Sequence, residues 1–229
     1  MSQYIWCEDS GSGFQFWCTI CQSLYPEIVV ESKGNNSRLR KAAEKIQDDG
    51  NQYFILMDAA VDNPDVLREN NKLLHDTADK NNVHIIQIHS FELVLLSFRQ
   101  LEQWVFAETD ELRDKRQGLL RAAALFVKLI TDGGTGEELS ELKDAVSDSA
   151  EYNSEQLAGK LLYEITRNTG FETDKGNLGK CFYISCCDWT DRAKNDFCGL
   201  DHNRISAETK AQMIVDQSIL KGALERVGL

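Results

Sequence analysis

The chain has 229 residues, 42% of them hydrophobic, and a formal net charge of -12 at pH 7. This length fits one large domain or a domain with an appendage, and the charge argues against broad, non-specific coating of nucleic acid. No apolar run reaches membrane-spanning length, no basic-then-apolar leader opens the chain, and its seven cysteines are too few and scattered for a secreted disulfide scaffold. We therefore expect a cytoplasmic protein with no membrane partner.

The first predicted strand, over residues 3–7, ends in two acids. Glu8 and Asp9 follow it directly, and a Ser-Gly-Ser-Gly turn leads into a helical stretch over residues 14–24. In open α/β sheets, ligands bind just beyond the carboxyl ends of the strands, which makes Glu8 a candidate general base or metal ligand. The alternative is an acid that only caps the following helix.

A second predicted strand, over residues 28–32, runs into a polar and basic turn before a helix over residues 39–48. The turn contains Lys33, Asn35 and Arg38. Basic residues near a helix start suit a phosphate that also takes the N-terminal amides, so these three residues are candidate phosphate or nucleic-acid ligands. An ordinary glycine-containing turn from strand to helix has the same pattern.

The centre of the chain is an apolar run over residues 53–57 followed by two acids four positions apart. Such an unbroken run indicates a strand buried on both faces, as in a parallel sheet. Asp58 and Asp62 follow it, and Pro64 comes next. Two carboxylates at the end of a buried strand form a good platform for Mg²⁺. A solvated acidic turn is the alternative.

A fourth predicted strand, over residues 83–88, also leads to an acid, Glu92. Strands alternating with helices over about the first hundred residues predict an α/β fold with a four-stranded parallel sheet flanked by helices. Because parallel strands end at one edge of the sheet, we expect Glu8, Asp58 and Asp62 to converge there, with Glu92 nearby.

In their order and spacing these segments resemble the Toprim domain of topoisomerases, primases and nucleases of the OLD (overcoming-lysogenization-defect) type. The resembling parts are Glu8, the polar turn after the second strand, and the stretch Asp58-Ala-Ala-Val-Asp62. The resemblance implies a Toprim-like domain over residues 1–97 and a metal-dependent nuclease for DNA or RNA, of the kind used in anti-phage defence. It also implies that Glu8, Asp58 and Asp62 are catalytic and, with Glu92, hold Mg²⁺ or Mn²⁺.

Two positions depart from the Toprim pattern. Asp9 stands where the family usually has Gly, and Ala60 stands where it has a second Asp. A natural loss of a metal ligand and a deliberate Asp→Ala change at position 60 both explain Ala60. The alternative function is therefore a catalytically inactive Toprim-like subunit that regulates or scaffolds a larger complex.

The second half of the chain predicts a mainly helical C-terminal region over residues 98–229. Apolar periodicity supports this prediction, and the helical stretches are residues 98–130, 137–146, 154–168 and 206–227.

A Cys-rich segment lies within that region, over residues 181–202. Cys181, Cys186, Cys198 and His202 are candidate Zn²⁺ ligands, since tetrahedral zinc takes four such groups. Their spacing is not that of the paired Cys and His motifs that usually bind zinc. The alternative interpretation is a buried, cysteine-rich packing patch.

The acidity of the chain also bears on its partners. A nucleic-acid substrate would be repelled except near the basic turn, so we expect a homo-oligomer or a complex with a regulatory protein, such as an ATPase, that controls access to the site.

Overall fold

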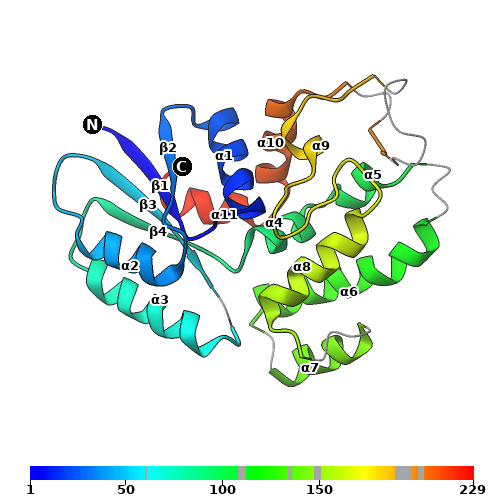
Figure 1. The fold of residues 1–229 in the computed structure, drawn as a ribbon, viewed down its shortest axis with the longest axis horizontal. Helices are drawn as coiled ribbons and strands as arrows, with labels where there is room; N and C mark the ends of the chain where they lie inside the picture. Colours follow the sequence, from blue (N-terminus) through cyan, green and yellow to red (C-terminus); the bar gives the residue numbers. More distant parts are fainter. Residues whose placement is uncertain (60, 108–111, 134–135, 147–150, 189–197, 201–203) are drawn as a thin grey trace.

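The computed structural model describes the whole chain except residues 60, 108–111, 134–135, 147–150, 189–197 and 201–203. A parallel sheet with helices on both faces forms the N-terminal part, and a mainly helical region lies beyond the carboxyl end of that sheet (Figure 1). The α/β class and the helical C-terminal region that the sequence predicts are confirmed.

The sheet has four parallel strands in the order β2-β1-β3-β4. Ile5 of β1 pairs with Phe54 of β3, and Ile55 of β3 pairs with Ile85 of β4, so the predicted strands are neighbours in one sheet. The elements of this part are β1 (Gln3–Cys7), α1 (Ser12–Leu24), β2 (Ile28–Ser32), α2 (Asn36–Glu44), β3 (Gln52–Asp58), α3 (Pro64–Thr77), β4 (Val83–Ile88) and α4 (Phe91–Ser97).

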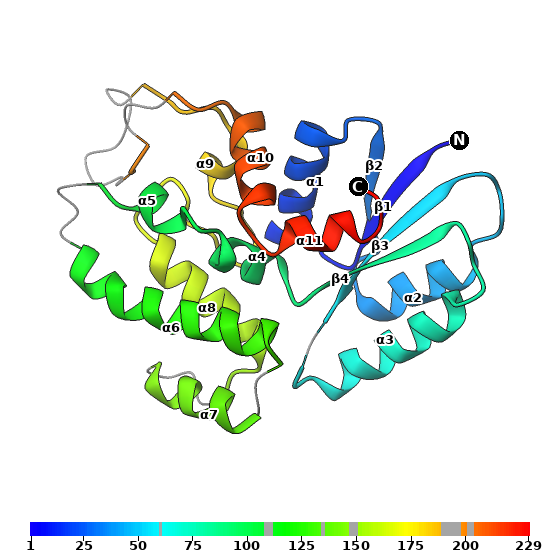
Figure 2. The same ribbon diagram turned by 180° about the vertical axis from the view of Figure 1, so that it is seen from behind.

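Helices cover the two faces of the sheet in different ways. On one face, α2 and α3 pack over β3 and form a small core of Leu39, Ala43, Ile46, Tyr53, Ile55, Met57 and Leu73. On the other face, seen from behind in Figure 2, α1 and α11 pack over the strands as part of a much larger core. Burial on both faces explains why the run in β3 is continuously apolar.

The C-terminal region continues that larger core rather than building one of its own. The hydrophobic cluster that begins at Ile5 and includes Phe16 of α1 extends to Leu161 of α8 and to Leu224 of α11. Helix α10 packs on α1, and α11 packs on β4. The elements are α5 (Leu101–Val105), α6 (Arg113–Thr131), α7 (Gly136–Ala145), α8 (Ser154–Thr166), α9 (Lys180–Tyr183), α10 (Ala207–Asp216) and α11 (Leu220–Glu225).

The C-terminal helices differ from the predicted stretches mainly in where they break. The stretch over residues 98–130 is divided between α5 and α6, and the stretch over residues 206–227 between α10 and α11. Ser206 accepts a hydrogen bond from the Thr209 amide at 3.0 Å and caps α10. In the part of the chain that is described, no helix is long and apolar enough to cross a membrane.

Candidate active site

A cleft of about 970 Å³ opens at the carboxyl edge of the sheet, between the strand ends and helix α8. Its sheet side carries acids that follow β1, β3 and β4, and its other side is formed by α8 and the loop over residues 173–175. The acids that line it are Glu8, Asp9, Asp58, Glu92, Glu155 and Asp174. The expected edge of the sheet therefore does border a cavity, and that cavity is strongly acidic.

Glu8 and Asp58 meet inside this cleft because β1 and β3 are neighbours in the sheet. Burial, together with a hydrogen bond between the two carboxyl groups, raises the pKa of Asp58 well above its usual range. The Asn36 side chain donates to Asp58 Oδ2 at 3.4 Å, and the Asn70 side chain donates to the Asp58 carbonyl. Two carboxyl groups in such contact share a proton, since two carboxylates would repel each other.

Three further acids in the cleft have raised pKa values, and burial is the main cause for each. It raises the pKa of Asp9 to about 6, although the Trp17 indole donates to its Oδ2 at 3.0 Å. It raises the pKa of Glu155 to about 7 and that of Glu92 to about 8, with neighbouring acids adding to both. Acids gathered with perturbed pKa values are typical of functional sites.

Asp62 does not join this group. Its carboxylate accepts hydrogen bonds from Ser154 at the start of α8, 2.6 Å from Oγ and 3.0 Å from the amide, and it pairs with Lys143 of α7 at 3.1 Å. Burial alone would raise the pKa of Asp62, but these hydrogen bonds outweigh it and lower the pKa. Asp62 therefore links the sheet to the helical region instead of facing Asp58, and residue 60 lies outside the described residues.

His89, at the end of β4, completes this link. Its Nε2 lies 2.8 Å from Ser154 Oγ, and both residues are buried. Burial lowers the pKa of His89 to about 4, so the imidazole is neutral at pH 7. Since Ser154 Oγ donates to Asp62, it accepts the hydrogen bond from His89 Nε2, which leaves Nδ1 buried without a hydrogen-bond partner in the described residues.

The three candidate phosphate ligands lie at the start of α2, beside the cleft. Lys33 Nζ pairs with Glu31 at 2.6 Å and lies 3.7 Å from the centroid of the Trp6 ring, which engages its charge. Asn35 caps α2 by accepting from the Arg38 amide at 2.9 Å. Arg38 is exposed. Of this turn only Gly34 lines the cleft itself, and a phosphate role for the three residues stays a prediction.

The Cys-rich segment is spread along the C-terminal region. Cys181 lies in α9, the Cys186 amide donates to the Ile205 carbonyl at 2.9 Å, and Cys198 is buried beside α5. His202 lies outside the described residues. The structure describes all seven cysteines, and none is in a disulfide. The zinc site stays a prediction.

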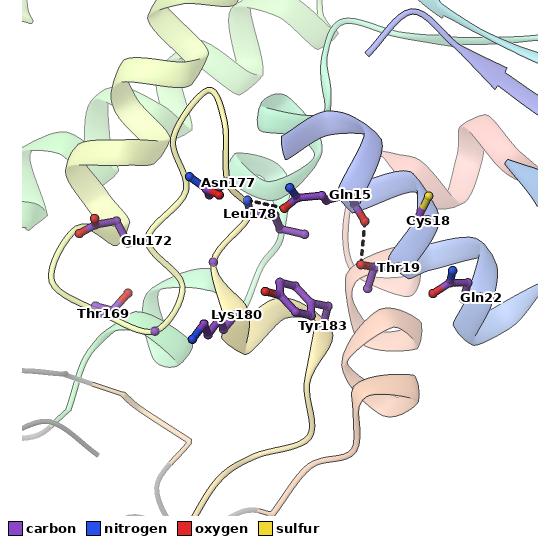
Figure 3. Close-up of a pocket in the computed structure, with 12 residues that line it drawn as sticks. Gln15, Cys18, Thr19, Gln22, Thr169, Glu172, Asn177, Leu178, Lys180 and Tyr183 are labelled. Carbon is purple, nitrogen blue, oxygen red and sulfur yellow. Dashed lines mark hydrogen bonds between the residues drawn. The ribbon is translucent and has the colours of Figure 1, made fainter. Parts of the chain in front are cut away.

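The loop over residues 173–179, whose first three residues line the cleft, is held in position by contacts with α1 and Gly11. Gln15 of α1 accepts from the Leu178 amide at 3.0 Å (Figure 3). The Gln15 side chain also donates to the Gly176 carbonyl at 3.3 Å. Lys175 packs its carbonyl so closely on Gly11 that any Cβ at position 11 would overlap it. On the far side of this loop lies a second groove of about 610 Å³, with Cys18 and Tyr183 in its lining.

The donor set of the cleft fits a hard divalent cation such as Mg²⁺, because it consists of carboxyl oxygens. Glu8 and Asp58 are hydrogen-bonded to each other, and burial raises the pKa of Glu92, so a cation in the cleft would stabilise the ionised form of these acids. Among the described residues, however, no three acid, histidine or cysteine side chains already form a metal-binding group. An ion in the cleft would therefore require these side chains to draw together.

Glu155 is the site residue that sequence reasoning missed. Its position follows from the start of α8, where Asn153 accepts from the Gln156 amide at 2.8 Å and Gln156 accepts from the Asn153 amide at 3.0 Å. This capping box is visible in the sequence as Asn-x-x-Gln and places Glu155 in the first turn of the helix. Nothing local shows that this turn faces the end of the sheet.

Comparisons of the chain with protein-family models, with curated proteins and with solved structures found no match.

Proposed function

We propose that this chain is a metal-dependent nuclease of the Toprim type, which hydrolyses phosphodiester bonds in DNA or RNA. The observation that supports the proposal is the contact between Glu8 and Asp58 at the ends of adjacent strands, inside an acidic cleft. Ionisation of both carboxyl groups in such contact is unfavourable, and a divalent cation would offset the repulsion between the two carboxylates.

In this proposal Glu8, Asp58 and Glu92 hold Mg²⁺ or Mn²⁺. When bound, the ion supplies positive charge that stabilises the charge developing on the phosphate. Glu155 accepts the proton of the attacking water, since its pKa of about 7 leaves a fraction of it ionised at neutral pH. The bond between phosphorus and the leaving oxygen then breaks, and that oxygen takes a proton from solvent.

A cleavage assay tests this function. The substrates are single-stranded, duplex and structured DNA and RNA, each with Mg²⁺, Mn²⁺ or chelator. We expect Ala60→Asp to increase cleavage by restoring a carboxylate, and Glu155→Gln in that background to reduce it about 10²- to 10⁴-fold. Glu27→Gln, at an exposed acid outside the cleft, is the control. No cleavage of any substrate by the parent chain or by Ala60→Asp would contradict a nuclease function.

An inactive regulatory or scaffolding subunit is the second candidate. It is favoured by Asp62, whose carboxylate is engaged by Ser154 and Lys143, and by the alanine at position 60. If Ala60→Asp stays inert and Glu8→Gln leaves the cellular function intact, this candidate replaces the nuclease.

A homo-oligomer or a complex with an ATPase fits both candidate functions. Light scattering that gives a 25.9 kDa particle, together with a pull-down from the host that retains no other protein, would contradict such an assembly.

A further inference from the structure

The acidic cleft has two unlike walls. The strand ends supply the carboxyl groups described above. The opposite wall is formed by α8, the residues just before it and the loop over residues 173–175, and it adds amide, aromatic and basic side chains, which are Tyr152, Asn153, Gln156, Lys160, Tyr163 and Lys175. The aromatic and basic side chains of this set are not the ligands of a hard metal ion, so they point to a second ligand in the cleft.

One face of α8 carries this wall. Gln156, Lys160 and Tyr163 are spaced at i, i+4 and i+7, so they form one stripe along the helix, and all three line the cleft. The opposite stripe of α8 is fully buried in the core, with Leu157, Leu161 and Ile165. Tyr163 stays outside that core and is 36% exposed. The ring is therefore available to a ligand in the cleft.

The wall is held in a fixed position against the acids. Ser154, at the start of α8, is hydrogen-bonded to Asp62 and His89, which follow β3 and β4, and Gly159 of α8 lies near the Glu92 carboxyl group. The Gln15 contact fixes the loop that carries Lys175 (Figure 3). Binding a ligand between the walls would therefore lose little freedom of the backbone.

The charges on this wall can exchange partners. Lys160 pairs with Glu164 at 2.9 Å, and Glu164 also pairs with Arg167 at 2.9 Å. Because Glu164 keeps Arg167 as a partner, a phosphate can compete for the ammonium group of Lys160. Lys175 is exposed at the rim of the cleft. Cations next to exposed aromatic rings are the combination with which proteins bind single strands, where phosphates meet the cations and bases stack on the rings.

We propose that the α8 wall binds a single strand of nucleic acid, with a base stacked on Tyr163 and phosphates at Lys160 and Lys175. The inference rests on the proposed function, because it assigns the substrate of the same cleft. A volume of about 970 Å³ is that of a pocket for a few linked nucleotides rather than for a duplex. The acids on the facing wall repel phosphates, so strand binding depends on a divalent cation in the cleft.

Fluorescence anisotropy tests this assignment. The probes are labelled 12-mers of single-stranded DNA and RNA, the matching duplex, and unlabelled AMP as a competitor, with Ca²⁺ as the cation. We expect the single strand to bind more tightly than the duplex or AMP. Tyr163→Ala should weaken strand binding about 5- to 30-fold, and Tyr163→Phe should keep most of it, because the ring supplies the stacking. Lys175→Ala should reduce the salt dependence by about one phosphate contact.

Tyr183→Ala and Lys221→Ala are the matched controls, because both residues are exposed and neither lines the acidic cleft. Duplex binding as tight as strand binding, AMP that competes as well as a strand, the same loss in Tyr163→Ala as in Tyr183→Ala, or no binding at all would each overturn the proposal. Strand binding that depends on Tyr163, without any cleavage, would support the binding site on α8 and contradict the proposed nuclease function. Cleavage that Tyr163→Ala does not reduce would support the nuclease function and contradict the binding site on α8.

Discussion

Ser154 joins the sheet to the helical region through polar contacts at the scale of single residues. Its hydroxyl and amide both contact Asp62, and His89 contacts the same hydroxyl. Ser154 and His89 are buried, and an unpaired donor or acceptor away from water is costly. The contact also sets the position of Glu155, the next residue along the chain.

Ser154→Ala removes this hydroxyl, which leaves His89 Nε2 and Asp62 Oδ1 with one partner fewer. We expect the free energy of unfolding to fall by about 1–3 kcal/mol, measured by urea denaturation. Ser140→Ala, at an exposed position on α7, is the control and should change stability by less than about 0.5 kcal/mol. Equal effects of the two changes would mean that the Ser154 contacts add nothing to the fold.

Glu92 makes stability depend on pH. Its pKa is about 8 in the folded chain, against an ordinary value of 4.5, so between these values the folded state binds a proton that the unfolded state releases. The stabilisation from this proton is complete below pH 4.5 and is lost as the pH rises through 8. Without metal, we expect the melting temperature to fall between about pH 5 and pH 8 and to level off at higher pH.

Glu92→Gln should make that fall less steep, because the amide is neutral throughout, and the rest of the fall comes from Asp58, Asp9 and Glu155, whose pKa values are also raised. Glu102→Gln, at an exposed acid of α5, controls for the change in net charge and should keep the slope of the parent chain. Thermal melts of the three proteins in chelator-containing buffers provide the measurement. A slope in Glu92→Gln as steep as that of the parent chain would assign the pH dependence to the other groups.

At the scale of elements, the strands and their terminal acids were the most predictable features. Each strand is a short apolar run, and local sequence alone places Glu8 and Asp58 where their strands end. The partner of Asp62 was not predictable, because Ser154 lies 92 positions away and reaches it only through the docking of α8. Glu155 escaped notice for the same reason, since its facing acids come from strands more than sixty residues earlier.

Gly13 in the first turn of α1 allows the Asp9 side chain to lie against the helix backbone. A Cβ there would overlap the Asp9 carboxyl group. We expect Gly13→Ala to displace Asp9 and lower stability by about 1–3 kcal/mol. Gly118→Ala in α6, where nothing lies within 4 Å of the added Cβ, should instead raise stability by about 0.5–1 kcal/mol. Chemical denaturation of both variants tests the pair, and a stabilised Gly13→Ala would contradict the packing.

At the scale of the whole molecule, the proposed metal should couple to folding. An ion that binds only the folded chain at about one hundred times its Kd adds about 2.7 kcal/mol of stability, which raises the melting temperature by about 5–10 °C for a chain of this size. Melts in Mg²⁺, Mn²⁺ and chelator at matched ionic strength measure the shift. Glu8→Gln should abolish most of it, and an equal shift in that variant would place the ion elsewhere.

The two regions share one hydrophobic core, so we expect the fragment 1–97 not to fold alone. Without the C-terminal region, α1 loses α10 and β4 loses α11, which exposes side chains such as Phe16. Each large apolar side chain returned to water costs about 1.5–3 kcal/mol, and several of them exceed the 5–15 kcal/mol that stabilises a typical domain. Circular dichroism and the dispersion of amide proton resonances compare the fragment with the full chain. A cooperative melt and dispersed resonances for residues 1–97 would instead show that this part folds without the C-terminal region.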